Sequence, residues 1–303
     1  MSVFHEGRMA LTRTLRFMYR HAPTGRSARW IRYSLRKLCV DDEVEVLVRY
    51  GFRMAVSPRD YISHGIYFFG EYDAEMSSML LPLLKPGAQA WDVGAERGWF
   101  TLLMAKAVGR EGCVQSFEAF PPNFARLRSN IDRNGFSWVS AHCLAVTESG
   151  GERWFVPPSN EITRHVSHLD HCSGVGYVAT EERPGAIRLP GTSIDEHADR
   201  VGTERLDLIK MDIEGAEVSA LRGGRRTLAR FRPVLAIEYN RACLQRAGTS
   251  WQELDELLDE YGYDRFTLRG TLQRFRLEEW QGKSDAQAVF NVYAFPRLGP
   301  ASR

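Results

Sequence analysis

The chain has 303 residues, of which 44% are hydrophobic and 26% charged, an ordinary composition for a globular protein with a full core. Its 40 basic and 38 acidic residues leave a net charge of +2, so the molecule as a whole has no field that would gather polyanions such as nucleic acids. Five scattered cysteines without a C-x-x-C pair argue against a zinc ribbon, and no apolar run approaches the roughly 18 residues of a membrane span, so we expect a cytoplasmic protein.

Positive charge is concentrated at the N-terminus. Residues 1–40 contain nine lysines and arginines and a single acid, Glu6, a net charge of +8 that leaves the remaining chain at −6. Apolar residues recur among the arginines of residues 8–39 at near-helical spacing, which predicts two short basic amphipathic helices that either cap the domain or make peripheral contact with an acidic membrane surface. We therefore expect a basic extension of helices and a strand over 1–57 and one large domain over 58–298.

From residue 73 onward, short apolar strands alternate with amphipathic helices. The pattern predicts strands over 88–93, 113–118, 138–146, 206–213 and 233–239, two late strands over 265–269 and 288–295, and helices over 73–85, 98–108, 121–135, 216–231 and 250–263. The stretch between residues 147 and 205 reads as irregular. Near-continuous apolar strands alternating with helices predict a doubly wound α/β fold, with a mostly parallel sheet covered on both faces.

Four carboxylates stand at the ends of predicted strands. Asp92, Glu118, Asp212 and Glu238 end the first, second, fourth and fifth strands. In a doubly wound sheet the ligand binds beyond these strand ends, where the strand order reverses. Any one of these acids is equally well explained as a helix cap or first-turn residue, but four together indicate a ligand site.

The glycine loop "WDVGAERGWF" at 91–100 distinguishes between two adenosine cofactors. Glu118 is placed to accept hydrogen bonds from a ribose in either NAD or S-adenosylmethionine. A dinucleotide site needs G-x-G-x-x-G beside a free helix N-terminus, whereas here three residues separate Gly94 from Gly98, and Asp92 and Glu96 lie beside the glycines. Acids repel a pyrophosphate but suit a sulfonium, so the loop favours S-adenosylmethionine.

The segments "WDVGAERGWFTLLMAKAVGREGCVQSFEAFPPNFARLRSNIDRNG", "TSIDE" and "LDLIKMDIEGAEVSALRGGRRTLARFRPVLAIEYN" resemble the FkbM family of S-adenosylmethionine-dependent methyltransferases, over roughly residues 60–297. The resemblance implies the Rossmann-like class I methyltransferase fold with a seven-stranded sheet, and O-methylation of a hydroxyl on a sugar, polyketide or similar small molecule. Two departures are visible. The family commonly has Asn-Ile where this chain has Glu96-Arg97, and "FEPNP" where it has Glu118-Ala119-Phe120-Pro121.

The expected cofactor contacts come from the glycine loop and the ends of the next two strands: Asp92, Gly94, Ala95, Gly98, Glu118, Ala119 and Ala145. Attack of a hydroxyl on the sulfonium methyl requires orientation and removal of a proton. Asp212 is the first candidate base, and the further catalytic candidates are Glu214 and His168. The resemblance places Asp212, Glu214 and Glu217 in the family's acidic block, although Glu217 is as well explained as a first-turn acid.

The sequence offers two candidate sets of metal ligands. Asp212, Glu238 and Asn240 lie at neighbouring strand ends and would offer oxygen ligands to Mg²⁺, but Lys210 would satisfy a buried acid equally well, so we expect no metal. In "RHVSHLDHC", His165, His168 and His171 recur every three residues, but the usual zinc ligand pairs are missing. This segment is more consistent with a substrate-facing loop.

Two rival functions remain from sequence alone. An NAD-dependent oxidoreductase is disfavoured by the glycine spacing and by Asp92, and a non-catalytic cofactor-binding scaffold is suggested only by the Glu96-Arg97 departure. A nucleic-acid substrate is disfavoured because the domain is net acidic.

Overall fold

A computed structural model describes residues 43–58, 61–158, 176–271, 274–282 and 289–297, together with Thr14 and Met18, which are both helical. The remainder of the basic segment 8–39 and the histidine segment 165–172 lie outside the described residues. The chain divides into two compact units, Met1–Ala74 and Glu75–Arg303. The boundary predicted at 57/58 falls inside the first unit and stays a prediction. None of the helices in the described part of the chain is long and apolar enough to cross a membrane.

The described part of the first unit is a hairpin and a helix. Strands β1 (Val44–Leu47) and β2 (Arg53–Val56) pair antiparallel, and helix α3 spans Tyr61–Phe69. The strand predicted from residue 43 therefore folds back on itself, with the turn closed by the Gly51 N–H, which donates to the Val48 carbonyl.

The second unit is built on an eight-stranded sheet. Its strands are β3 (Gln89–Val93), β4 (Cys113–Phe117), β5 (Val139–His142), β10 (Leu208–Met211), β11 (Val234–Asn240), β12 (Tyr263–Thr271), β13 (Arg274–Glu279) and β14 (Val289–Pro296). Their order is β13-β12-β14-β11-β10-β3-β4-β5. The five strands from β11 to β5 are parallel, whereas β12, β13 and β14 pair antiparallel. The strand order reverses between β3 and β10.

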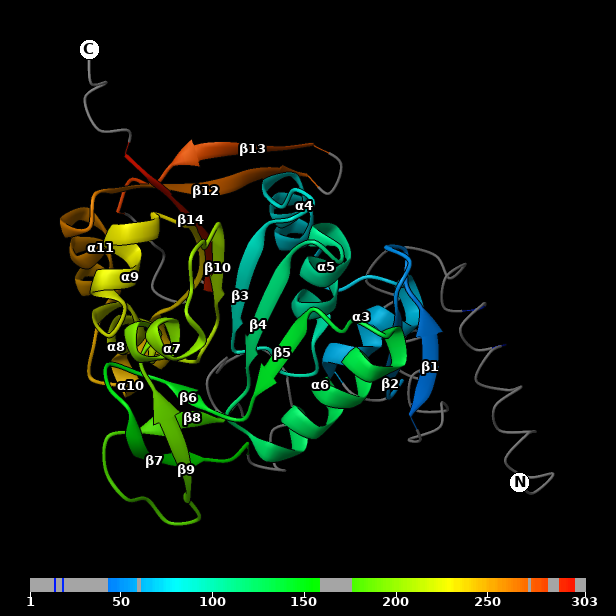
Figure 1. Ribbon diagram of the computed structural model, residues 1–303, viewed down its shortest axis with the longest axis horizontal. Coiled ribbons are helices and arrows are strands. Elements are labelled where there is room, and N and C mark those ends of the chain that lie inside the picture. The colour runs from blue at the N-terminus through cyan, green and yellow to red at the C-terminus, as the bar shows by residue number, and fades with distance from the viewer. Residues whose placement is uncertain are drawn as a thin grey trace. The chain divides into compact units, whose positions relative to one another are not determined.

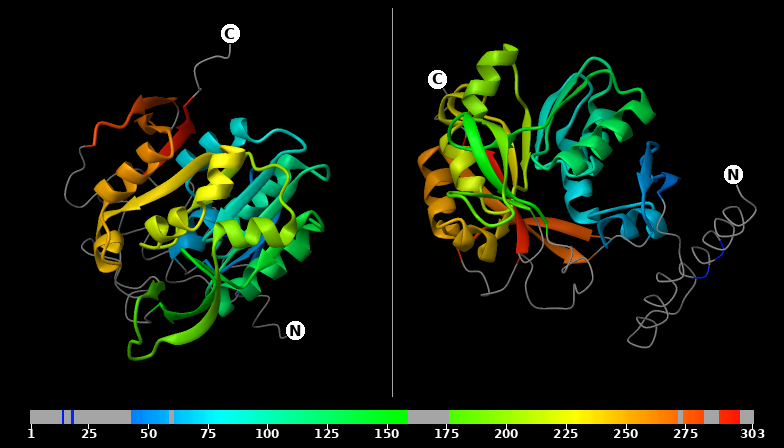
Figure 2. Two further views of the ribbon diagram at one scale, coloured as in Figure 1. Left: turned by 60° about the vertical axis from the view of Figure 1, so that its left-hand side comes forward. Right: turned by 90° about the horizontal axis from the view of Figure 1, so that it is seen from below.

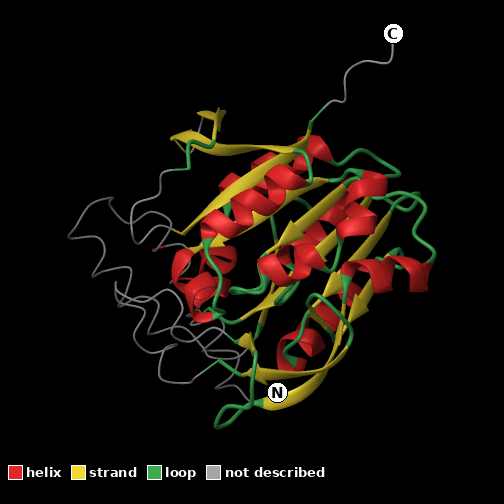
Figure 3. Cartoon of the chain, turned by 90° about the vertical axis from the view of Figure 1, so that its left-hand side faces the viewer, coloured by secondary structure: helices red, strands yellow, loops and turns green. Residues whose placement is uncertain are grey.

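Helices cover both faces of this sheet, as the pattern predicts (Figures 1 and 3). One face carries α4 (Ala74–Leu83), α5 (Trp99–Val108) and α6 (Pro121–Asn134), and the other carries α7 (Ile194–Val201), α8 (Glu217–Arg222), α9 (Arg225–Phe231) and α11 (Trp251–Glu260). The short helix α10 (Arg241–Arg246) follows β11 directly. The core between sheet and helices is apolar, with Trp91, Ile209 and Leu235 at most 2% exposed. The doubly wound, Rossmann-like α/β fold is thereby confirmed.

The stretch that reads as irregular in sequence contains a second sheet. It consists of β6 (Ala145–Val146), β7 (Gly151–Val156), β8 (Tyr177–Ala179) and β9 (Ile187–Thr192), in the order β6-β9-β7-β8. The strand predicted over 138–146 breaks between β5 and β6, because Ala145 leaves the large sheet and pairs with Gly191. The small sheet lies beyond the carboxyl end of β5 (Figures 1 and 2). It has its own core of Ala145, Phe155 and Leu189.

Two further differences have local causes. The large sheet has an eighth strand, β13, which the predicted seven strands omit although Phe275 and Leu277 alternate with charged residues in the manner of a strand. The helix predicted over 216–231 divides into α8 and α9 at Gly223-Gly224. A side chain at Gly223 would place its Cβ 2.5 Å from the Thr147 carbonyl oxygen, so the chain passes too close there for an ordinary helix surface.

Candidate active site at the reversal of strand order

The acidic residues predicted from sequence gather where β3 and β10 lie side by side. The register pairs Asp92 with Lys210, and Met211 with Val93 on one side and Ile237 on the other. Asp212 and Glu238 therefore stand one row beyond Met211 and Ile237, at the carboxyl edge of the sheet. This edge is where doubly wound folds bind their ligands.

Asp92 lies inside the protein below this edge and is fully buried. Its Oδ2 accepts a hydrogen bond of 2.6 Å from the Thr101 hydroxyl of α5, and Thr101 in turn lies 2.7 Å from the Ser116 hydroxyl. Its Oδ1 faces Nζ of Lys210 at 3.4 Å. Asp92 was predicted as a cofactor contact. In the structure its carboxylate instead supports the loop from within, and a direct contact with the cofactor stays a prediction.

Lys210 is the buried cation at the centre of the site, only 2% exposed. Its ammonium group donates to the Gly94 carbonyl at 2.8 Å and lies 3.6 Å from Oδ2 of Asp212. Burial alone would lower the pKa of Lys210, but the carboxylates of Asp92 and Asp212 outweigh it and raise this pKa. Lys210 therefore stays charged and joins the glycine loop to the β10 edge.

The glycine loop needs left-handed backbone at three positions. Gly94 (φ +84°) and Gly98 (φ +97°) adopt such angles, and a Cβ on Gly94 would lie 1.8 Å from the Asp212 carbonyl oxygen. Between them, Glu96 also has a positive φ of 51°. Asparagine tolerates this conformation better than glutamate, which explains why it suits the position in the family pattern. Here Oε1 of Glu96 lies 3.3 Å from Nε of Arg97, so the two residues that replace Asn-Ile form an ion pair with each other.

Glu118 ends β4 next to this loop and is 8% exposed. Its Oε2 accepts from the Glu96 N–H at 2.7 Å and its Oε1 accepts from the Phe120 N–H at 2.8 Å. Burial raises the pKa of Glu118 to about 8, although both backbone hydrogen bonds act in the opposite direction. The carboxyl group is thus fixed in direction at the strand end, as a ribose ligand would require.

The loop from β10 to α8 carries three acids with different surroundings. Glu217 is buried and turns back on the loop, where its carboxylate accepts from the N–H groups of Ile213 and Gly215, both at 3.0 Å. Its contacts are those of a structural first-turn acid, and burial raises its pKa to about 7. Asp212 keeps 31% of its side chain exposed. Burial and the charge of Asp212 together raise the pKa of Glu214 well above its usual range.

Glu238 completes a group of three carboxylates. Oxygen atoms of Asp212, Glu214 and Glu238 lie within 4.8 Å of one another. Burial and the charge of Asp212 raise the pKa of Glu238 well above its usual range. In the predicted metal set the third member was Asn240, but the Asn240 Oδ1 caps α10 by accepting from the Cys243 N–H. The structure therefore brings Glu214, and not Asn240, into this cluster.

The other residues predicted for the site are three alanines and His168. Ala119 follows Glu118 along the chain, and Ala95 of the glycine loop is buried, with its N–H donating to the Phe117 carbonyl. Ala145 is 2% exposed within the small sheet. His168 lies outside the described residues. Their proposed roles stay predictions. The sequence analysis did not predict a role for Thr101, whose hydroxyl donates to Asp92. Its position in the first turn of α5, nine residues after Asp92, is the sequence feature that could have indicated this contact.

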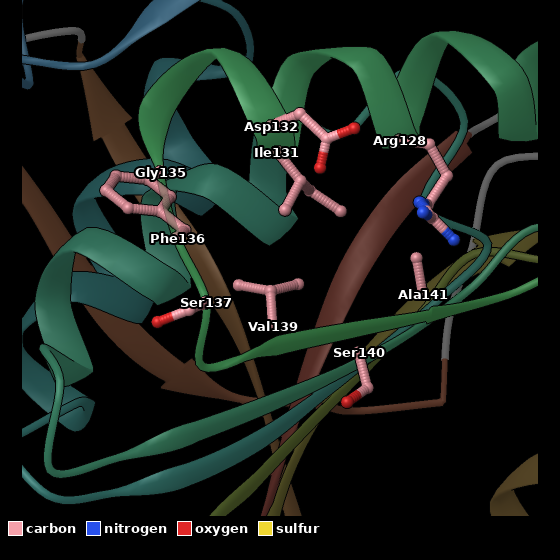
Figure 4. A pocket seen from close by; sticks show the side chains of 9 residues that line it. All are labelled: Arg128, Ile131, Asp132, Gly135, Phe136, Ser137, Val139, Ser140 and Ala141. Carbon is pink, nitrogen blue, oxygen red and sulfur yellow. The ribbon is translucent and has the colours of Figure 1, made fainter.

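A hollow of about 520 Å³ lies elsewhere, at the outer edge of the large sheet. Figure 4 shows it between α6, which contributes Arg128 and Asp132, and β5, which contributes Val139, Ser140 and Ala141. None of the predicted site residues lines it. We therefore place the candidate active site at the carboxyl ends of β3, β4, β10 and β11, where the acids converge.

Residues 92–265 match the family model described as the methyltransferase FkbM domain. This match covers more than half of the chain and includes the glycine loop, Glu118, the β10–α8 loop and Glu238. The chain belongs to the FkbM methyltransferase family. The family assignment confirms the resemblance found in the sequence.

Curated relatives match parts of this chain. The AMB antimetabolite synthetase AmbE of Pseudomonas aeruginosa is 25% identical over 209 residues, 60% of this chain and 10% of the synthetase. Methyltransferase 1 of Beauveria bassiana is 27% identical over 142 residues, 44% of this chain and 56% of that protein. The tRNA (adenine(58)-N(1))-methyltransferase TrmI of Thermus thermophilus is 38% identical over 61 residues, 20% of this chain and 24% of TrmI. The chain thus spans well under two thirds of each relative.

Two solved structures are similar to this chain at low sequence identity. Methyltransferase FkbM from Methylobacillus flagellatus is 16% identical, with a TM-score of 0.41 over 95% of this chain and 58% of that one. A putative O-methyltransferase from Klebsiella pneumoniae is 12% identical, with a TM-score of 0.42 over 75% of this chain and 80% of that one.

Proposed function

We propose that this FkbM methyltransferase transfers the methyl group of S-adenosylmethionine to a hydroxyl group of a small molecule, such as a sugar or a polyketide. The observation that carries the proposal is the convergence of Glu118, Asp212, Glu214 and Glu238 on one sheet edge beside a glycine loop. Such an edge is unsuited to a pyrophosphate and suited to a cation with a ribose attached. The match to an antimetabolite synthetase is in line with a small-molecule acceptor.

Each part of the site has a proposed task. The Glu118 carboxylate, held by two backbone N–H groups, accepts hydrogen bonds from the ribose hydroxyls. The left-handed backbone at Gly94 and Gly98 shapes the loop that faces the methionine part. The acids at the carboxyl ends of β10 and β11 attract the sulfonium, whose positive charge compensates carboxylates that otherwise repel one another.

In the reaction the acceptor oxygen attacks the sulfonium methyl carbon. A carbon–oxygen bond forms, the carbon–sulfur bond breaks with its electron pair going to sulfur, and S-adenosylhomocysteine leaves. The hydroxyl proton passes to a base, for which Asp212 is our first choice because its side chain is 31% exposed and lies at the β10 edge. The ammonium group of Lys210 lies 3.6 Å from Oδ2 of Asp212. His168 remains an alternative base.

A divalent metal at Asp212, Glu214 and Glu238 is an alternative way to activate the hydroxyl. Oxygen ligands of this kind suit Mg²⁺, for which these three residues would provide the protein ligands. We propose that the cluster works without it, because Lys210 and the cofactor's own charge already offset the acids.

The first experiment is titration calorimetry with S-adenosylmethionine, S-adenosylhomocysteine and NAD, with and without Mg²⁺. We expect the two adenosyl ligands to bind and NAD not to bind. Binding of NAD alone would overturn the proposal.

The second experiment measures methyl transfer from labelled S-adenosylmethionine to three pools of acceptors: sugars and glycosides, polyketides, and tRNA. We expect transfer to a hydroxyl compound, undiminished by EDTA and abolished in Asp212→Asn with cofactor affinity nearly unchanged. Glu256→Gln, an exposed acid on α11, is the matched control. Methylation of tRNA alone would exclude the small-molecule acceptor, binding without any transfer would favour a scaffold, and loss of activity in EDTA would support the metal.

A further inference from the structure

Arg246, at the end of α10, contacts both the β10–α8 loop of the candidate site and the small sheet through its guanidinium group. Its Nη2 donates a hydrogen bond of 2.9 Å to the backbone carbonyl of Glu214. Its guanidinium carbon also lies 3.8 Å from the centre of the ring of Tyr177, the first residue of β8. Arg246 thereby joins the small sheet to the loop that carries the acids, and Figure 1 shows α10 near both α8 and β8.

The loop that Arg246 holds has an unfavourable backbone. Glu214 has a φ of 55°, which non-glycine residues adopt rarely. Its neighbour Gly215 has a φ of 109°, and a Cβ there would lie 2.3 Å from the Cys243 carbonyl oxygen of α10. Strained backbone of this kind persists only where surrounding groups hold it.

Cys243 of α10 contacts the Glu214 side chain, with Sγ 3.0 Å from Oε2, and two other groups hold the backbone of the loop. The Glu217 carboxylate binds the N–H groups of Ile213 and Gly215, and Arg246 binds the carbonyl of the residue between them. The first interaction belongs to the loop itself, since Glu217 lies at its end. The second comes from α10 and is the one that connects the loop with Tyr177.

We propose that Arg246 is a positioning residue for methyl transfer, which keeps Glu214 turned toward Asp212 and Glu238 by binding the Glu214 carbonyl and stacking on Tyr177. The inference rests on the proposed function, because it assigns Arg246 to the acid cluster of that site. Its positive charge adds to this role, since it offsets part of the negative charge that the three carboxylates place together. Lysine would keep the charge and a donor but lose the planar stacking surface.

The test compares Arg246→Ala, Arg246→Lys and Tyr177→Ala with the wild type, using an acceptor from the screen above. Arg241→Ala is the matched control, because Arg241 is a partly exposed residue at the other end of the same helix. We expect Arg246→Ala to lower kcat about tenfold, the size expected for loss of a charged hydrogen bond, with the affinity for S-adenosylhomocysteine within about twofold of wild type. Arg246→Lys should recover part of kcat, and Arg241→Ala should match the wild type.

Coupling between the two contacts is a further readout. If Arg246 acts through Tyr177 as well as Glu214, the effects of Arg246→Ala and Tyr177→Ala on kcat will not multiply in the double variant. An unchanged kcat in Arg246→Ala would overturn the inference. So would equal losses of kcat, cofactor affinity and thermal stability without recovery in Arg246→Lys, because those indicate general damage to the fold.

The inference is separable from the proposed function. If the wild type transfers no methyl group, the proposed function fails, and hydrogen exchange of the S-adenosylhomocysteine-saturated protein then decides the role of Arg246. We expect faster exchange in Arg246→Ala at the amides of residues 213–217 and of β8, but not in α5. Unchanged exchange in both segments would overturn the positioning role.

Discussion

At the scale of single residues, Glu118 gives the candidate site its most testable property. Its folded pKa of about 8 lies above its ordinary value because burial disfavours the charge. Near pH 7 the group is therefore largely protonated in the protein without ligand. Hydrogen bonds from ribose hydroxyls favour the ionised carboxylate, so binding of the cofactor should lower this pKa and release protons.

We expect titration of S-adenosylhomocysteine at pH 7 to show proton release, measured as a binding enthalpy that differs between phosphate and Tris buffers. Glu118→Gln should abolish this difference and weaken binding by about 1.5–3 kcal/mol, the range for a hydrogen bond to a charged group. Glu256→Gln is the control and should behave as wild type. Equal affinity in Glu118→Gln would remove Glu118 from the ribose site.

The same shift affects stability. Because the folded pKa of Glu118 is raised, the group's contribution to the free energy of unfolding is complete below the unfolded value of 4.5 and is lost as the pH rises toward 8. The protein thus places a carboxyl group where it lowers stability at neutral pH. Such an arrangement is common where a group serves a ligand.

At the scale of elements, the glycine loop after β3 depends on its contact with the β10 edge. A Cβ on Gly94 would approach the Asp212 carbonyl oxygen to 1.8 Å, so the two loops have room for each other only because this residue lacks a side chain. Gly87 has nearly the same φ, 81° against 84°, but no atom lies within 4 Å of a Cβ built there. The pair separates the cost of conformation from the cost of the close approach.

We expect Gly87→Ala to lower the free energy of unfolding by about 1–2 kcal/mol, the cost of left-handed backbone alone. Gly94→Ala should cost a further 1–3 kcal/mol, roughly the penalty of overpacking, and should also weaken S-adenosylhomocysteine binding. Urea unfolding and calorimetry measure the two effects. Equal destabilisation by both variants would show that the loop after β3 adapts freely.

At the scale of the whole molecule, the face of the sheet opposite α5 contains a buried polar group that responds to acid. His197 of α7 is 1% exposed and packs against the rings of Trp91, Phe117 and His142. Its Nε2 lies 3.3 Å from Oε1 of Gln115, and its Nδ1 makes no hydrogen bond within the described residues. Burial, with the charges of His142 and Arg200, lowers the pKa of His197 to about 3.

Because the folded pKa of His197 lies below the unfolded value of 6.5, the unfolded chain takes up the proton first. Its contribution to stability is therefore complete above pH 6.5 and is lost as the pH falls toward 3. We expect urea unfolding to show a steeper loss of stability between pH 6.5 and 4.5 in the wild type than in His197→Phe. His197→Gln serves if the phenylalanine variant does not fold, and identical pH slopes in both variants and the wild type would contradict the assignment.

The sequence by itself determined the sheet, the order of the main helices and the family. Apolar strands of about five residues between amphipathic helices leave few arrangements, because a parallel sheet must be covered on both faces. The strand-end acids and the glycine spacing follow from the same local pattern, and they identified the edge where the site lies. Strand β13 could have been predicted in the same way, because Phe275 and Leu277 alternate with charged residues.

Only the tertiary structure decided what each of these acids touches. Asp92 and Glu217 have the same charge as Asp212, but both are buried. Asp92 faces Lys210, which is distant in sequence, whereas Glu217 binds N–H groups of its own turn. Asn240 caps a helix through the N–H three positions further on. Arg246, by contrast, has no sequence signal because its partners Glu214 and Tyr177 lie 32 and 69 positions away. Local periodicity records which face of an element is buried, whereas a hydrogen bond between distant segments depends on how the elements pack.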